Sequence, residues 1–479
     1  MVVYKKIMEK GASKLYRISI IILFLISLTL WVLPVIFANE VIWQKTFGTP
    51  LWDKGYALAE AQDGGIVFVG TANRDISGTS RDNDEYVWVI KTDNSGNHLW
   101  NKTFPGVIKT WGMGIIATND NGFAFATSRG SGFWLVKIDS NGDKQWERDY
   151  QGYGKGDLPF SMIQTSDGGF AMLGRNPKEW NFYLTKTDSN GWEQWSKSYG
   201  GDYIEQGYSV VEDTDGGYSL VGRTRSFGIG NTDDVWIIKT DGSGNKLWDK
   251  TFGTSDPSES GHGHIQDSNN NYLISATPDM WLIKTDNSGN HLWNKTIEGA
   301  WGHGIGKGVI NTFDSGYAVT GQINSNMAIV KLGSDGNEEW KFIVDGEDGS
   351  SGRSIIQTSD GSYVIVGVIG TGPVEPCLTC DLFIAKVGVP TALQITDIIP
   401  IQVVEGVDLV KDKSGIVRVV VKKNSPDDIR AKVKLSFDGE QVDDEKEVIL
   451  NEEINNIDFI FKPDRAGTNL KLKAEVAEL

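Results

Sequence analysis

The pattern of apolar and polar positions along most of the chain is that of short β-strands joined by tight turns. Residues 235–253 show it most plainly, with an apolar run (VWIIK), a polar stretch (DGSGN) and a second run of strand length (LWDKTF). An Asp that can bond its own downstream backbone, followed by a Gly that adopts positive φ, is typical of hairpin connections. The stretch therefore predicts a β-hairpin.

Copies of this hairpin recur through the first four-fifths of the chain. Each copy has a Trp four residues after a Gly, and these are Trp100, Trp146, Trp195, Trp248, Trp293 and Trp340. The first five copies also have an Asp three residues before the Gly, whereas the sixth has Gly333 there. Between copies, a strand of small residues runs into a tight D-G-G turn and then into another strand, as in residues 207–224. Each period thus predicts four strands, the content of one propeller blade.

The two ends of the repeat region together supply the strands of one blade. Seven strands resemble VWIIK, and the last, residues 382–388, has no Trp strand after it. Residues 41–47 (VIWQKTF) form a Trp strand that has no hairpin partner before it. We predict that this strand, which contains Trp43, pairs with the last repeat and closes the ring, because an open stack would leave an exposed sheet edge. The expected fold is all-β, with a seven-bladed β-propeller over residues 39–390.

The segments on either side of the repeats have different patterns. Residues 1–17 carry five Lys and Arg, and the uncharged run 18–38 that follows is long enough to span a bilayer as a helix. We expect residues 1–38 to be either a cleaved signal peptide or a retained transmembrane anchor with its N-terminus in the cytoplasm. In both cases the chain from Asn39 onward is extracellular or at the cell surface. Residues 391–479 show period-two strands such as AKVKLSF (431–437), which predict a β-sandwich of about seven strands.

Composition and charge narrow the class of protein. The 57 Gly and 17 Trp fit a turn-rich all-β chain. The net charge of −17 argues against nucleic acid as a partner, since nucleic acid needs clustered Lys and Arg. The two cysteines, Cys377 and Cys380, form C-L-T-C, and outside the cell we expect a local disulfide. A zinc site would need two further ligands, and no second Cys pair exists.

The repeat resembles the tryptophan-docking repeat of quinoprotein-type propellers. The stretch S-G-N-H-L-W (95–100) matches that family's spacing from Gly to Trp, although the Asp lies one residue closer. It is also similar, in its place within the blade, to the Asp-box hairpin of sialidase propellers. The first resemblance implies that each Trp packs between adjacent blades as a structural residue. The residues concerned are Trp43, Trp100, Trp146, Trp195, Trp248, Trp293 and Trp340.

A second resemblance concerns the C-terminal region. Residues 417–439 (VRVVVKKNSPDDIRAKVKLSFDG) resemble CARDB and related immunoglobulin-like modules of prokaryotic surface proteins. The resemblance implies a stalk or adhesion spacer behind the propeller.

The connections opposite the uniform hairpin turns vary between repeats, and function generally lies on such loops. They contain aromatic residues beside Asp and Asn, which suit stacking on sugars or contact with a peptide. The candidate ligand-binding residues are Trp52, Trp111, Tyr153, Trp180, Tyr203 and Trp301. Capping of the blade ends is the alternative role for each ring. Acidic residues such as Glu205, Asp234 and Glu259 share these loops, and a glycosidase would need two of them at a fixed separation.

Three further sets of residues are candidates for chemistry. His262, His264 and His303 offer three imidazoles for a transition metal, with packing as the alternative because His264 replaces Val210 of the preceding repeat. The D-N-S-G-N turns resemble part of a calcium loop but lack its terminal Glu, so we predict no cofactor and leave calcium open. Asn101 and Asn294 begin glycosylation sequons.

The sequence favours a non-enzymatic cell-surface protein that presents the variable loops of a propeller to a glycan or a surface protein. The alternative is an extracellular carbohydrate-active enzyme with acidic residues at the mouth of the propeller channel. Two buried carboxyl groups facing each other across the channel would favour the enzyme. A shallow aromatic surface would favour binding.

Overall fold

The computed structural model describes the repeat region from residue 41 to 388, with gaps at 50–52, 74–84, 105–113, 130–131, 152–157, 177, 231, 256–257, 298–299, 302–307, 325, 345–349 and 371–379. It also describes the backbone of six strands between residues 393 and 478. All described elements are β-strands. Two compact units are present, and the larger comprises Asn39–Val389. The predicted N-terminal hydrophobic helix lies outside the described residues.

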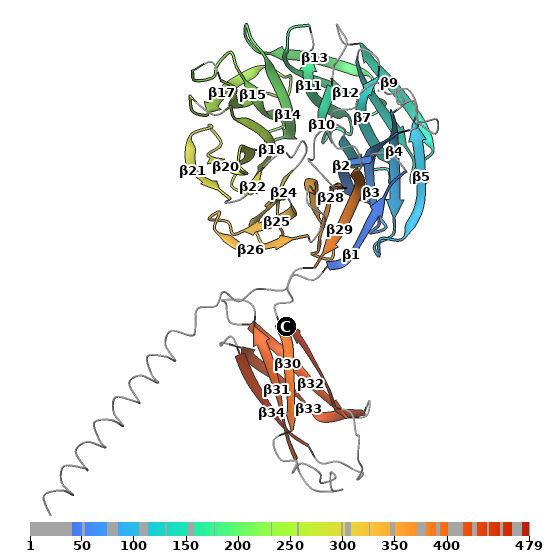
Figure 1. Ribbon diagram of the computed structural model, residues 1–479, viewed down its shortest axis with the longest axis vertical. Coiled ribbons are helices and arrows are strands. Elements are labelled where there is room, and N and C mark those ends of the chain that lie inside the picture. Colours follow the sequence, from blue (N-terminus) through green and yellow to red (C-terminus); the bar gives the residue numbers. More distant parts are fainter. Residues whose placement is uncertain are drawn as a thin grey trace, which may run out of the picture. The chain divides into compact units, whose positions relative to one another are not determined.

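Seven antiparallel sheets are arranged around a common axis as the blades of a propeller (Figure 1). Blade 1 consists of β2 (Asp53–Glu60), β3 (Ile66–Asn73), β4 (Glu85–Thr92) and β5 (His98–Phe104). Blade 2 consists of β6 (Gly114–Ala117), β7 (Phe123–Arg129), β8 (Gly132–Ile138) and β9 (Lys144–Gln151). Blade 3 consists of β10 (Leu158–Gln164), β11 (Phe170–Asn176), β12 (Asn181–Thr187) and β13 (Glu193–Tyr199).

The remaining blades repeat this order. Blade 4 consists of β14 (Glu205–Glu212), β15 (Tyr218–Thr224), β16 (Asp234–Thr240) and β17 (Lys246–Phe252). Blade 5 consists of β18 (Ser260–Gln266), β19 (Tyr272–Thr277), β20 (Trp281–Thr285) and β21 (His291–Thr296). In blade 6, β22 (Ala300–Trp301) and β23 (Val309–Asn311) both pair with β24 (Tyr317–Ile323), which is followed by β25 (Asn326–Leu332) and β26 (Glu338–Ile343).

Blade 7 confirms the predicted ring closure. Its strands are β27 (Ser351–Gln357), β28 (Tyr363–Gly370), β29 (Cys380–Val387) and, from the other end of the chain, β1 (Val41–Phe47). Strands β1 and β29 pair antiparallel, with Trp43 opposite Lys386 and Phe47 opposite Leu382. The all-β, seven-bladed propeller predicted from the repeats is therefore present.

The apolar core lies between neighbouring blades, because each sheet is covered on both faces. This explains why the third strand of a blade is a continuous apolar run: every residue of β16 is buried. Leu173 and Leu184 of blade 3 pack with Val210 and Trp236 of blade 4, for example. The Phe182 and Trp236 rings meet edge to face across this joint, with centroids 4.9 Å apart.

The repeated Trp of one blade lies against the repeated Gly of the next. Gly96 has φ 76°, and a Cβ atom there would stand 2.7 Å from the Trp43 ring. The same contact joins Gly142 to Trp100, Gly191 to Trp146, Gly244 to Trp195, Gly289 to Trp248 and Gly336 to Trp293. Trp43 Nε1 also donates to the Asn94 carbonyl at 2.8 Å. Glycine is needed at these turns both for its positive φ and for the room it leaves the indole.

A buried lysine in the third strand of every blade forms an ion pair that the sequence analysis missed. In six blades the partner is the Asp of the D-G-G-type turn, as in Lys137–Asp120 at 2.9 Å and Lys186–Asp167 at 2.8 Å. Although burial opposes it, hydrogen bonds from Thr118 and Lys137 lower the pKa of Asp120 to about 2. The other four pairs are Lys91–Asp63, Lys239–Asp215, Lys331–Asp314 and Lys386–Asp360. Each pair connects the two hairpins of its blade.

The C-terminal region contains two sheets of three strands. One has the order β30 (Leu393–Pro400), β31 (Gly415–Lys423), β34 (Ile454–Phe461). The other has the order β33 (Glu440–Leu450), β32 (Ile429–Phe437), β35 (Leu472–Glu478). The sequence predicted about seven strands, and the described residues hold six. The sandwich packing and the likeness to CARDB modules stay predictions.

Candidate functional site

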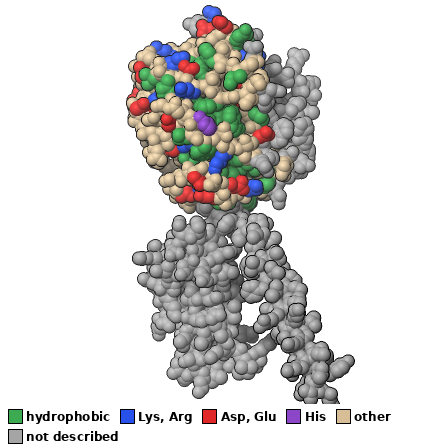
Figure 2. Space-filling view, turned by 90° about the vertical axis from the view of Figure 1, so that its left-hand side faces the viewer, with side chains coloured by type: hydrophobic (Ala, Val, Ile, Leu, Met, Phe, Trp, Pro, Cys, Tyr) green, Lys and Arg blue, Asp and Glu red, His purple; other side chains and the backbone are tan. Residues whose placement is uncertain are grey.

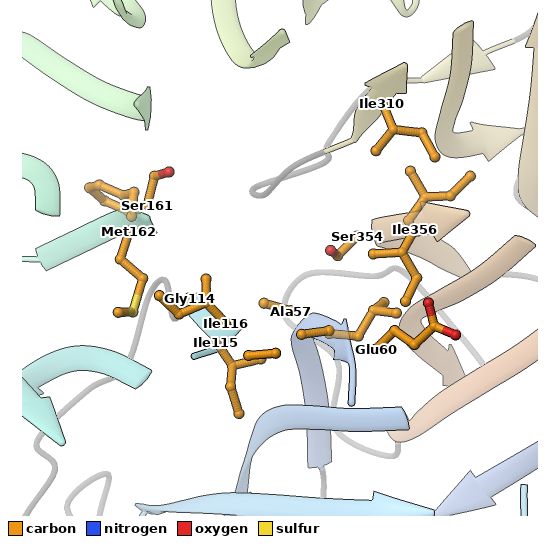
Figure 3. Close-up of a pocket in the computed structure, with 15 residues that line it drawn as sticks. Ala57, Glu60, Gly114, Ile115, Ile116, Ser161, Met162, Ile310, Ser354 and Ile356 are labelled. Carbon is orange, nitrogen blue, oxygen red and sulfur yellow. The ribbon is translucent and has the colours of Figure 1, made fainter. Parts of the chain in front are cut away.

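The inner strands of the blades line a central channel whose described wall is mainly apolar. A cavity of about 310 Å³ lies there (Figure 3). Ala57, Ile116, Ile310 and Ile356, from four different blades, contribute to its wall. Figure 3 shows these side chains around the opening, with the hydroxyls of Ser161 and Ser354 among them. Such a wall offers packing surface and few groups for acid–base chemistry.

Polar side chains at the ends of the inner strands tie six of the seven blades to the preceding blade. Gln164 Oε1 accepts a hydrogen bond from the Asn119 backbone N–H at 3.1 Å, and Gln266 Oε1 accepts one from Thr214 N–H at 3.0 Å. Glu60, the acidic residue of the cavity wall, accepts from Ser359 N–H at 2.9 Å in the same way. In blade 2 this position is Ala117, which has no such group. The Glu60 carboxylate therefore serves the joint between blades 7 and 1.

Two pairs of carboxyl groups meet at blade joints on the variable face, which is the face formed by the connections between hairpins. Asp234 is fully buried and Glu259 is 4% exposed. Burial raises the pKa of Glu259, and the nearby Asp234 raises it further. The second pair is Asp381 and Asp53, at the joint of blades 7 and 1. Both lie beside Gly48, because a Cβ atom placed on that glycine would stand 2.4 Å from Asp381 Oδ1 and 3.4 Å from Asp53 Oδ2. Raised pKa values are typical of catalytic acids, but Asp234 and Glu259 are closed to solvent and lie at a joint between blades.

Among the predicted ligand-binding residues, Trp180 and Tyr203 are described with their side chains. Both are exposed, Trp180 by 44% and Tyr203 by 59%, and they belong to loops at the joint of blades 3 and 4. The blade 4 loop adds Phe227 and Ile229, with exposed fractions of 44% and 52%. We call these four residues the aromatic patch. Trp52, Trp111 and Tyr153 lie outside the described residues, and of Trp301 only the backbone, in β22, is described.

Glu205 holds the loops of the aromatic patch together. Its backbone N–H donates to the Trp180 carbonyl at 2.6 Å. Its buried carboxylate accepts hydrogen bonds from Ser226 N–H at 3.0 Å and Gly201 N–H at 3.1 Å. Tyr203 N–H in turn donates to Ser226 Oγ at 2.8 Å. The sequence analysis placed Glu205 among surface acids, whereas the structure makes it the centre that fixes three loops.

Stacking contacts orient the rings of the aromatic patch. The Arg175 guanidinium lies 4.6 Å from the centre of the Trp180 ring, and Phe227 lies 5.1 Å from Trp236. Two other arginines nearby are occupied, because Arg223 and Arg225 bind Asp233 at 2.7 and 2.8 Å. The patch is therefore a supported surface of large side chains with one arginine stacked on it.

The histidines occupy positions that suit packing. His264 is 3% exposed, and its two ring nitrogens lie 2.9 Å from the hydroxyls of Ser209 and Ser219. The His262 ring lies 4.9 Å from Tyr208. His303 is outside the described residues, and no group of three metal-binding side chains was found among the residues that are described. The predicted metal site remains untested.

The remaining predicted sites are in part described. Asn101 and Asn294 are exposed on the outer strands β5 and β21. Cys380 is buried at the start of β29 and is not a free thiol, while Cys377 lies outside the described residues, so their pairing stays a prediction.

In the part of the chain with assigned structure, no helix has the length and apolar character of a membrane span. Hydrophobic, acidic and basic side chains are interspersed on the side of the propeller that carries β17 and β21 (Figure 2).

Comparison with known proteins gives structural likeness only. No protein-family model and no curated protein matches the chain. A solved streptogramin B lyase is 12% identical over 72% of this chain and 98% of its own, with a TM-score of 0.48. A virginiamycin B lyase from Staphylococcus aureus with quinupristin is 11% identical over 72% and 99%, with a TM-score of 0.49. YCF48 from Cyanidioschyzon merolae is 12% identical over 71% and 98%, with a TM-score of 0.43. Likeness at this level gives no guide to function.

Proposed function

We propose that the chain is an exported cell-surface protein whose propeller binds a ligand, a glycan or a surface protein, on its variable face and performs no reaction on it. The single observation that carries this proposal is the aromatic patch. Its four large side chains are exposed on loops fixed by buried carboxylates, those of Trp180, Tyr203 and Phe227 by Glu205 and that of Ile229 by Asp234, whose Oδ2 accepts from Ile229 N–H at 2.9 Å. An apolar surface kept open in this way is typical of binding sites. Ile229 offers no hydrogen bond, and Trp, Tyr and Arg are enriched at the centres of protein interfaces, which favours a protein ligand over a sugar.

Export and surface location rest on the sequence. The uncharged run of residues 18–38 follows a basic segment, as in signal peptides and anchors. The C-terminal module would act as a stalk or adhesion spacer.

The enzymatic alternative receives less support. The acidic residue that lines the channel cavity is Glu60, and its carboxylate accepts hydrogen bonds from Ser359. Glu212, at the same position in blade 4, accepts hydrogen bonds from Ser166 in the same way. Asp234 and Glu259, whose pKa values are raised by burial, lie out of solvent at a blade joint. A glycosidase needs both carboxyl groups in contact with the substrate.

The test measures binding of the full-length protein, in detergent, to arrays of glycans and of extracellular proteins, with and without calcium. We expect selective binding that is lost in the double variant Trp180→Ala, Tyr203→Ala. Trp192→Ala is the matched control, because Trp192 is an equally large ring, 62% exposed, on the opposite face of blade 3. Binding that survives the double variant, or release of products from an arrayed glycan, would contradict the proposal.

A further inference from the structure

A second pocket lies between blades 5 and 6, on the face formed by the hairpin turns and therefore away from the aromatic patch. Its volume is about 420 Å³, within the range of roughly 300–1,000 Å³ typical of small-molecule sites. Lys284, Asp267 and Tyr317 line it as buried residues. Leu292 and Trp293 form an apolar side, and both belong to β21.

Blade 5 departs from the repeat at the turn position that supplies the partner of the buried lysine. In six blades an Asp of the D-G-G-type turn binds the buried lysine, but blade 5 has Asn269 in that position, so Lys284 binds Asp267 at 2.5 Å instead. In blades 2, 3 and 6 the residue before the docking Trp covers the lysine: Gln145, Gln194 and Glu339 accept from it at 3.0, 3.1 and 2.8 Å. Blade 5 has Leu292 there, as blades 1 and 4 have Leu99 and Leu247, and the Leu292 side chain is 51% exposed. Lys284 therefore lacks the polar lid that those three blades provide.

The facing blade also departs from the repeat at this joint. Blade 6 has Gly333 and Ser334 where blade 5 has Asp286 and Asn287, so a small side chain borders the pocket. At the preceding joint, Asn270 of blade 5 reaches across and accepts a hydrogen bond from Thr214 Oγ1 at 2.8 Å. Blade 6 has Ser315 at the position of Asn270. The opening is therefore bordered by shorter side chains than the preceding joint has at the same positions.

The floor of the pocket is electrically balanced. Lys284 Nζ lies 2.5 Å from Asp267 Oδ2 and donates to Tyr317 Oη at 2.8 Å, and Tyr317 donates to the same carboxylate at 3.2 Å. Burial lowers the pKa of Lys284, although the hydrogen bond to Asp267 opposes this, and the hydrogen bond from Lys284 lowers the pKa of Asp267, although burial opposes it. A cation and an anion that neutralise each other leave no net charge to attract an ionic ligand.

The rim, by contrast, offers unused hydrogen-bonding groups of both kinds. Ser268, Asn269, Asn271, Ser315 and Ser334 border the pocket. Their hydroxyl and amide groups form no hydrogen bond to any part of the chain that the structure describes. Hydroxyls and amides both donate and accept, so together they match a ligand that carries several hydroxyl groups.

From this combination we propose that the pocket binds a neutral sugar residue. One apolar face of the sugar ring packs on Trp293 and Leu292, and its hydroxyls form hydrogen bonds with the rim amides and serines. The site is separate from the aromatic patch, so its failure and the failure of the proposed function are distinguishable.

The test titrates the full-length protein with neutral monosaccharides, namely glucose, galactose, mannose and N-acetylglucosamine, by saturation-transfer NMR and calorimetry. We expect saturable binding of at least one sugar, weakened by roughly tenfold or more in Ser334→Phe, which fills the opening. Asn287→Phe, the same change at the equivalent position one blade earlier, is the matched control and should keep the affinity of the unmodified chain. Asn269→Asp should also weaken binding, because it adds the turn carboxylate beside Lys284.

Several outcomes would overturn the site. Absence of binding by every neutral sugar to the folded protein would do so, and so would equal affinity in Ser334→Phe and the unmodified chain. Preference for an acidic sugar or inorganic phosphate would contradict the balanced floor. Loss of sugar binding in Trp180→Ala would place the sugar at the aromatic patch instead.

Discussion

Glycine is favoured in the hairpin turns for two reasons, its positive φ and the space that a docked indole leaves, and two positions separate these reasons. Gly142 has φ 80° and lies against Trp100, whereas Gly64 has φ 76° and has no atom within 4 Å of where a Cβ would be placed. Both positions favour glycine for its conformation. At Gly142, but not at Gly64, a docked indole also occupies the space that a side chain would need.

This difference predicts unequal effects of the same substitution. Gly64→Ala should lower the free energy of unfolding by about 1 kcal/mol, from the positive φ alone. Gly142→Ala should cost a further 1 to 3 kcal/mol or so, because a Cβ would stand 2.8 Å from the Trp100 ring. Urea unfolding of the two variants, followed by circular dichroism, measures the difference. Equal losses would mean that the indole moves aside without cost.

At the scale of the element, the pairing of the two hairpins within a blade depends on the buried lysine and the turn aspartate. The carboxylates are half-exposed while the ammonium groups are buried, as in Lys186–Asp167 with 5% and 54% side-chain exposure. The lysine therefore depends on its partner more than the aspartate does. Although burial opposes it, hydrogen bonds from Lys186 and Thr165 lower the pKa of Asp167 to about 2.

Because the pKa of Asp167 is lowered in the folded chain, we expect the stability of the fold to fall in acid. A carboxyl group whose pKa is lower in the folded than in the unfolded chain stabilises the fold above its ordinary pKa near 3.8, and this contribution is lost as the pH falls from about 4 to about 2. Asp167→Asn should lower the free energy of unfolding at pH 7 by about 1 to 3 kcal/mol. The deficit should shrink toward pH 2, where about half of the Asp167 carboxyl groups of the unmodified protein are themselves protonated. Unfolding curves at pH 7, 4 and 2 test this, and a deficit that is constant with pH would contradict it.

The blades could be predicted from the sequence, and Trp180 and Tyr203 of the aromatic patch were named from it as candidates, whereas the ion pairs and the role of Glu205 were missed. A hairpin is set by neighbouring residues, so the six Gly-to-Trp copies and the seven strands that resemble VWIIK were sufficient to count the sheets. Lys239 and Asp215 lie 24 residues apart on different hairpins, and their pairing follows only from the register of β15 with β16. Both residues do recur in register along the repeats, and that recurrence was the available signal. The role of Glu205 depends on three loops converging, which no local pattern reports.

At the scale of the whole molecule, the propeller is a closed ring in which one pair of neighbouring strands, β1 and β29, has no hairpin turn between them. Every other Trp strand follows its partner through a short hairpin turn, whereas β1 meets β29 from the far end of the propeller sequence. Loss of contacts in a hairpin-tethered strand leaves the strand close to its partner, because the effective loop is short. Loss of contacts in β1 lets that strand move away from β29, because the chain that connects the two strands is long.

A pair of variants tests this asymmetry. Trp43→Ala should speed amide hydrogen exchange in β29 by about tenfold for each 1.4 kcal/mol lost. Trp195→Ala removes the same indole from β13, which stays tethered to β12, so exchange in β12 should change much less. Mass spectrometry of peptides from β29 and β12 makes the comparison. Similar acceleration in both strands would mean that the hairpin tether adds nothing.

The origin of β1 also governs when the protein can be completed during synthesis. Leu382 follows Phe47 by 335 residues, which ribosomes translate in about 17 to 67 seconds at about 5–20 residues per second. For that interval the first strand to emerge has no partner, while blades 1 to 6 acquire all of theirs. A nascent chain therefore carries an unmatched strand bearing a tryptophan until nearly the last repeat is made, and during this interval it is most exposed to association with other chains.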